Sequence, residues 1–201
     1  MTGGEAARPI HLGRPLDPDI SNAILDSTLE VLAGKGYGRL TVGEVARRAG
    51  VHKPAVYRRW GSRLDLVVAA ISTLVADTDD PETGDIRSDL VQLLVAFSGT
   101  SRRKQDLALR LPAELAAEPV LGAAVEARIV APRRGLVRSV IERGIERGQL
   151  TVDTDPDLLI EILFGPLHLR AAKGETISGR DAEAIVDVVF RGRGTRKRGG
   201  A

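Results

Sequence analysis

The sequence predicts an all-α protein with an N-terminal three-helix unit, which contains a helix-turn-helix, and a larger C-terminal helical unit. Apolar residues recur at intervals of three and four in almost every segment of the 201-residue chain. Capping residues and glycines divide the first third of the chain into short helices. The acidic stretch DTDDPETG, residues 77–84, interrupts the apolar pattern and marks the expected boundary between the two units.

The composition excludes several classes of protein and site. The chain has no cysteine, and its three histidines (His11, His52 and His168) are far apart, so we expect no disulfide, no metal site and no cofactor. Residues 1–19 lack the apolar stretch of a secretory signal, and no apolar run approaches the roughly 18 residues that span a bilayer. These features predict a cytoplasmic protein without a membrane partner.

Charge is unevenly distributed along the chain. Residues 39–63 contain seven basic residues and one acid, whereas residues 77–190 contain 14 basic and 20 acidic residues. A basic segment of this kind suits the phosphates of nucleic acid, although basic residues also gather on ordinary solvated helices.

The N-terminal unit is expected to begin after a flexible arm, residues 1–16, that contains glycine and proline but no apolar periodicity. Asp17 followed by Pro18 predicts the start of the first helix, because aspartate caps helices and proline suits the first helical position. Gly34 and Gly36 predict its end.

Two short helices then form the predicted helix-turn-helix, residues 41–60. Thr41 and Glu44 have the spacing of a capping box at the start of a helix that ends at Gly50. The second short helix is expected over residues 53–60, and another capped helix follows directly. The second helix of such a motif enters the major groove of DNA, but a similar hairpin can also be purely structural.

Apolar spacing predicts further helices beyond the boundary, around residues 90–97, 107–115 and 119–129, and over 133–147, 157–173 and 181–190. The pair Gly165–Pro166 is expected to kink the helix over 157–173. Residues 192–201 are rich in glycine and basic residues and are expected to form a disordered tail.

The segment TVGEVARRAGVHKPAVYRRWGSRLDLV resembles the N-terminal signature of the TetR family of bacterial transcriptional regulators. The resemblance covers residues 17–77 and extends more loosely to RRGLVRSVIERGIERGQL and LLIEILFGPLHLRAA. It implies a homodimer that binds a palindromic operator in double-stranded DNA. It also implies that residues 78–191 bind a small-molecule effector and dimerise through helices near 133–147 and 157–173.

The resemblance places candidate DNA contacts on this motif: Thr41, Lys53, Tyr57, Arg58, Arg59 and Arg63. His52 stands where the family has a hydroxyl cap, and we expect it to reach a phosphate or a base. Ala55 replaces a usual hydroxyl residue, and its methyl group suits contact with a thymine methyl. Arg14, in the arm, is a candidate for the minor groove. Val56 and Trp60 are expected to pack inward.

An effector site between helices is expected to be mainly apolar with few polar groups. The candidates are Leu93, Phe97, Leu111 and His168, although His168 also fits an ordinary interface position. The sequence does not identify the effector.

The leading functional hypothesis is a repressor that an effector releases from its operator. A DNA-binding activator or architectural protein without an effector is the alternative. A mostly apolar cavity inside residues 85–147 would favour the repressor, and a filled core there would favour the alternative. An enzyme is not expected and no catalytic residue is assigned, because the sequence shows neither paired carboxylates near a histidine nor a phosphate-binding glycine loop.

Overall fold

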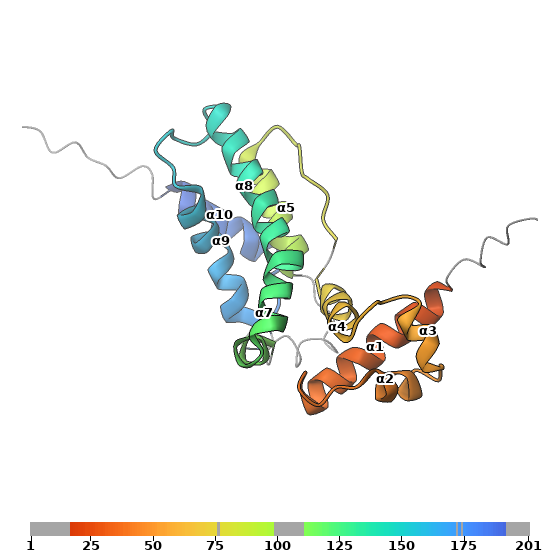
Figure 1. Cartoon of the computed structure of the whole chain (residues 1–201). Coiled ribbons are helices and arrows are strands. Elements are labelled where there is room, and N and C mark those ends of the chain that lie inside the picture. Colours follow the sequence, from red (N-terminus) through yellow and green to blue (C-terminus); the bar gives the residue numbers. More distant parts are fainter. Residues whose placement is uncertain (1–16, 76, 99–110, 172, 174, 192–201) are drawn as a thin grey trace, which may run out of the picture.

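The computed structural model describes residues 17–191, except 76, 99–110, 172 and 174. The expected arm with Arg14 and the expected tail therefore lie outside the described residues. Over the described part the chain is helical and contains no strand, which confirms the predicted all-α fold (Figure 1). None of the described helices is both long enough and apolar enough to cross a membrane.

The N-terminal unit consists of α1 (Pro18–Lys35), α2 (Val42–Arg48), α3 (Lys53–Tyr57) and α4 (Arg63–Ser72). As predicted, Asp17 caps α1: its carboxylate accepts a hydrogen bond from the amide of Asp19 at 3.0 Å. Gly36 ends the helix with a φ of +75°, a left-handed conformation that favours glycine.

The core of this unit lies where α1 contacts α2 and α4. Ile24, Leu40, Val45 and Leu66 are fully buried there. The inward positions predicted in the helix-turn-helix are confirmed, because Val56 is buried in the same core and Trp60 packs against it. Apolar packing therefore fixes which side of α3 faces outward.

The larger unit contains α5 (Ile86–Ser98), α7 (Pro119–Val125), η1 (Glu126–Val130), α8 (Ala131–Glu146), α9 (Pro156–Ala171) and α10 (Gly179–Arg191). Residues 111–117 are also helical. The sequence predicted separate helices after Pro119 and Pro132. In the structure the π-helical turn η1 joins α7 to α8, so residues 119–146 form one continuous helix (Figure 1).

Pro119 is tolerated because it stands in the first turn of the continuous helix. Pro132 lies inside that helix, directly after the π-helical turn η1, where the regular hydrogen-bond pattern already changes. Helix α9 likewise continues through Pro166. Helices α5, α8, α9 and α10 pack around a second core, in which Leu90, Leu93 and Leu163 are fully buried.

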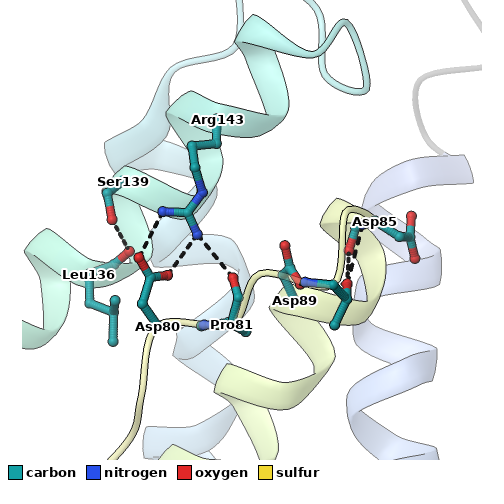
Figure 2. Close-up of polar contacts among 8 residues, drawn as sticks. Asp80, Pro81, Asp85, Asp89, Leu136, Ser139 and Arg143 are labelled. Atoms are coloured by element: carbon teal, nitrogen blue, oxygen red, sulfur yellow. Dashed lines mark hydrogen bonds and ion pairs between the residues drawn. The ribbon is translucent and has the colours of Figure 1, made fainter.

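The linker between the units is fastened to α8 and to the start of α5. The Arg143 guanidinium binds both carboxylate oxygens of Asp80, at 2.6 and 2.8 Å, and the carbonyl of Pro81 at 3.0 Å (Figure 2). The Asp80 carboxylate holds the pKa of Arg143 above its usual range. The buried carboxylate of Asp89 accepts hydrogen bonds from the amide and hydroxyl of Thr83.

The two units share a core at the N-terminal end of the continuous helix over residues 119–146. Leu121, Val125 and Ile129 belong to the first core, together with α1 and α4, although they lie beyond the predicted boundary at residues 77–84. Arg128 of η1 binds Asp65 of α4 at 2.6 Å. The N-terminal unit is thus directly attached to the helix that continues into the larger unit.

Candidate nucleic-acid interface and effector cavity

Helix α3 presents a polar and cationic outer face. Lys53 and Arg58 are exposed, and the Tyr57 side chain is 45% exposed. Lys53 and Tyr57 lie one helical turn apart, with the Lys53 ammonium 5.8 Å from the centre of the tyrosine ring. Because Val56 points into the core, these three side chains are left on the side of α3 that is open to a partner.

Thr41 is exposed at the start of α2 and caps it, because its hydroxyl oxygen accepts a hydrogen bond from the Glu44 amide at 3.2 Å. The expected capping box is only half formed. The Glu44 carboxylate instead binds the Lys35 ammonium at 2.7 Å, which lowers the pKa of Glu44. The capping bond still leaves the exposed Thr41 side chain at the surface, beside the helix-turn-helix.

His52 is also exposed, at the residue that precedes α3. Within the described helix-turn-helix its imidazole makes no cap hydrogen bond to α3. Ala55 is half-buried on the same helix. The structure thus separates His52, which is accessible, from Ala55, whose methyl group is partly covered.

Arg59 differs from the expectation that it continues the exposed face of α3. Its guanidinium turns back and donates hydrogen bonds to the Ser21 hydroxyl at 3.0 Å and to the Ala55 carbonyl at 3.0 Å. It also reaches the Asp17 carbonyl at 3.5 Å. The donors of Arg59 are therefore engaged in holding α3 against the start of α1.

Arg63 is likewise turned inward, onto the loop between α1 and α2. Its guanidinium lies 4.2 Å from the centre of the Tyr37 ring and donates hydrogen bonds to the carbonyls of Tyr37 and Leu40, at 3.4 and 3.2 Å. The half-buried Arg63 thus supports the loop that precedes Thr41. Charge alone did not distinguish this bracing role from phosphate contact.

A cavity of about 330 Å³ lies mainly in the larger unit, with walls from α5, η1, α8 and α9, from the segment before α10 and from Val75 beyond α4. It extends beyond residues 85–147, where a cavity was expected. Most of its wall is apolar, including Phe97, Ile129, Val137, Ile160, Phe164 and Ile177. The structure places two of the four candidate effector residues, Phe97 and His168, on this wall.

The other two candidate effector residues lie elsewhere. Leu93 is fully buried in the second core, and Leu111 packs against the first core, so neither is among the residues that line this cavity. Both were chosen as members of apolar helix faces. Such a pattern identifies an inward side but cannot distinguish a filled core from a cavity wall.

Arg133 is a lining residue that the sequence analysis missed. Every fourth residue from 125 to 141 lies along one row of the continuous helix, and the other members (Val125, Ile129, Val137 and Ile141) are buried and apolar. A lone arginine in an apolar row was the signal that could have found it. Its guanidinium lies 5.7 Å from the centre of the Phe97 ring, and burial lowers its pKa.

Helix α9 is unusual because large apolar side chains also occur on its outer side. Leu158, Ile162 and Leu169 are 54%, 51% and 61% exposed. The opposite side of the same helix carries Leu163, which is fully buried. A helix on the surface of a single subunit normally has one apolar face, which is buried, and a polar face toward solvent. The exposed apolar row formed by Leu158, Ile162 and Leu169, here called the α9 stripe, therefore indicates a surface that a partner covers.

Comparison with known families gives two matches that together span most of the chain. Residues 24–70 match a family described as bacterial regulatory proteins, tetR family. Residues 80–189 match a domain described as tetracyclin repressor-like, C-terminal domain.

Two individual proteins are similar in sequence to this chain over most of its length. The chain is 30% identical to the uncharacterized HTH-type transcriptional regulator Rv1556 of Mycobacterium tuberculosis, over 92% of this chain and 95% of that protein. It is 29% identical to the DNA-binding transcriptional repressor TetR of Mycobacteroides abscessus, over 85% and 91% of the two chains.

A crystal structure of the transcriptional regulator FadR from Bacillus subtilis in complex with stearoyl-CoA has a similar fold. It superposes with a TM-score of 0.67 and 17% identity, over 85% of this chain and 98% of that one.

Proposed function

The chain belongs to the TetR family of bacterial transcriptional regulators, and from this premise we propose that it is a cytoplasmic homodimeric repressor. Its two copies of α3 bind a palindromic operator, and a small-molecule effector bound in the larger unit releases the DNA. Family membership makes the protein a DNA-binding regulator, as the sequence analysis predicted. Enzymatic activity forms no part of the proposal.

The observation that carries the DNA-binding part is the outer face of α3. Lys53, Tyr57 and Arg58 project from a helix whose inner side is fixed by the buried Val56. A short helix held in this way can enter the major groove, where such side chains reach phosphates and base edges. We assign Thr41 and His52 to contacts at the edge of the same surface, and Arg59 and Arg63 to positioning it.

The α9 stripe is the observation that supports the proposed homodimer. A two-fold interface brings the same surface of each subunit together, so an apolar row on one helix is buried by its own copy. Helices near 133–147 and 157–173 thus form the proposed interface.

The cavity is the observation that supports the proposed binding of a small-molecule effector. Its volume of about 330 Å³ falls within the range of small-molecule sites, about 300–1,000 Å³. It favours the effector-released repressor over a regulator whose larger unit serves dimerisation alone. The name of the Mycobacteroides abscessus relative, a repressor, points in the same direction.

Substitution on α3 tests the DNA-binding surface. The operator is first obtained by selecting bound fragments from random double-stranded DNA, and a palindrome is expected. Lys53→Ala and Tyr57→Ala should each weaken operator binding by about 1–3 kcal/mol per half-site, because each removes a contact to a phosphate or base. Fluorescence anisotropy with labelled operator measures the change.

Matched variants separate these contacts from general effects. Arg180→Ala removes one positive charge from an exposed position in the larger unit, outside the proposed interface helices, and should leave operator binding unchanged. Tyr57→Phe retains the ring and tests the hydroxyl alone. Binding should also weaken steeply with added salt, because the basic surface displaces counterions from phosphates. Unchanged operator affinity in both alanine variants, with intact folding, would contradict the assignment.

A further inference from the structure

We propose that the effector is an apolar molecule with one anionic head group, such as a carboxylate, and that Arg133 is the residue that recognises this group. The inference rests on the proposed function, since it names the ligand class of the effector cavity.

The position of Arg133 is the first step of the argument. The row of residues spaced by four along the continuous helix is otherwise buried and apolar, from Val125 to Ile141. Arg133 itself is half-buried and places a cation among these apolar side chains, on the wall of the cavity. Its planar guanidinium can bind a carboxylate through two parallel hydrogen bonds.

The charges around the cavity are the second step. A second arginine, Arg134, also lines it, and Glu175 is the one carboxylate among the described lining residues. Asp77 acts on Arg133 from the neighbouring segment and partly offsets the effect of burial on the guanidinium pKa. The described part of the wall thus carries two guanidinium groups and one carboxylate, which favours a ligand with a single negative charge.

The remainder of the wall defines the rest of the ligand. Phe97 and Phe164 pack against each other with ring centres 5.5 Å apart, and both face the cavity. Ile129, Val137 and Ile160 continue the apolar lining. An aliphatic or aromatic body buried here is stabilised by about 25 cal/mol for each Å² removed from water. A wholly polar anion would leave this surface unused.

The test compares ligands that share a body and differ in the head group. Decanoate, decanol and decylamine are titrated into the full-length protein, with binding measured by calorimetry. Decanoate is expected to bind about tenfold more tightly than decanol, because a charge-assisted bidentate contact is added. Decylamine is expected to bind most weakly. Equal binding of all three, or preference for the amine, would overturn the proposal.

Variants at Arg133 identify the recognising group. Arg133→Gln should reduce decanoate affinity about tenfold and leave decanol affinity unchanged, whereas Arg133→Lys should retain a preference for the carboxylate. Arg39→Gln, an exposed change in the loop before α2 and away from the cavity, is the matched control and should leave both affinities as in the wild type. An undiminished preference for decanoate in Arg133→Gln would overturn the proposal, and so would its loss in Arg39→Gln.

Operator binding distinguishes failure of this inference from failure of the proposed function. If an uncharged compound releases the operator and decanoate does not bind, the repressor proposal stands and the ligand class is wrong. If decanoate binds with the expected dependence on Arg133 but leaves operator affinity unchanged, the ligand class stands and effector release is wrong.

Discussion

At the scale of single residues, the structure divides the basic side chains of the helix-turn-helix into two groups. Lys53 and Arg58 are exposed, whereas Arg59 and Arg63 bind carbonyl groups within the chain. The sequence predicted all four as DNA contacts. Charge and helical spacing cannot tell which arginine finds a carbonyl, because that depends on loops such as the one at Tyr37 that only the folded chain brings near.

Gly144 shows a residue-scale constraint that can be tested. A Cβ at this position in α8 would lie 2.9 Å from Cγ1 and 3.3 Å from Cβ of Ile86, so α5 and α8 are too close for a larger residue. Alanine gains up to about 1 kcal/mol in helix propensity, but overpacking costs about 1–3 kcal/mol. We expect Gly144→Ala to lower the free energy of unfolding by about 1–2 kcal/mol in urea denaturation.

A double-mutant cycle provides the control for Gly144. Ile86→Ala alone should be destabilising by about 2–5 kcal/mol, because it opens a cavity in the second core. In that background Gly144→Ala should become neutral or stabilising, since the two closest atoms, Cγ1 and Cδ1, are gone and only Cβ at 3.3 Å remains. A cost of Gly144→Ala that is the same in both backgrounds would show that the close approach to Ile86 is not its cause.

At the scale of elements, helix starts were predicted well because caps are local signals. Asp17, Thr41 and Ser62 each accept a hydrogen bond from an amide in the first turn of the following helix. The join between α7 and α8 was missed because Pro132 is a usual sign of a break. The π-helical turn η1, which carries the helix into α8, has no signal in the apolar spacing and is seen only in the folded backbone.

The η1 turn also links the cavity to the DNA-binding unit. It supplies Ile129 and Val130 to the cavity wall, and its Arg128 binds Asp65 at the N-terminus of α4. The Ser62 hydroxyl donates to the other Asp65 oxygen at 2.6 Å. The Ser62 hydroxyl first, and then Arg128, lower the pKa of Asp65 below its ordinary value of 3.8.

This link predicts a pH dependence of stability. Because the folded-state pKa of Asp65 is lowered, its carboxylate contributes stability fully at pH values above 3.8, and the contribution is lost as pH falls through the lowered pKa. Asp65→Asn should therefore be less stable than the wild type at neutral pH, and the difference should shrink in acid below pH 3.8. Fluorescence of Trp60, the single tryptophan, measures unfolding of the first core.

Arg128→Gln is the companion variant for Asp65. It removes the second cause of the pKa shift and leaves the Ser62 hydrogen bond in place, so it should destabilise the protein less than Asp65→Asn. The pH dependence that remains should come from Ser62. A stability difference between wild type and Asp65→Asn that is constant across the acidic range would contradict this account.

At the scale of the whole molecule, the basic segment over residues 39–63 and the exposed apolar row of α9 belong to different units of the chain. The basic segment lies on the N-terminal unit, and the α9 stripe lies on a helix of the larger unit, which Figure 1 places away from α3. Composition predicted the division of charge, whereas the family resemblance indicated α9 as a dimerising helix. The outer exposure of the stripe, however, follows from how α9 packs on α8, α5 and α10, which a single-helix pattern does not determine.

The α9 stripe gives the prediction at this scale. Ile162→Glu places a carboxylate at the centre of the proposed two-fold interface, where dimerisation would desolvate one uncompensated charge from each subunit. We expect dimer affinity to fall at least about a hundredfold, or about 3 kcal/mol, as measured by sedimentation velocity. Operator affinity should fall with it, because a monomer binds one half-site at a time.

Val152→Glu is the matched control, because it makes the same kind of change at an exposed apolar residue in the loop before α9. It should leave both the dimer and operator binding intact. Folding of the Ile162→Glu monomer is checked by far-ultraviolet circular dichroism, which reports on the helices of both units, because Trp60 lies in the first core and does not report on α9. A folded Ile162→Glu variant that dimerises as strongly as the wild type would place the interface elsewhere on the molecule, and the α9 stripe would then need another partner.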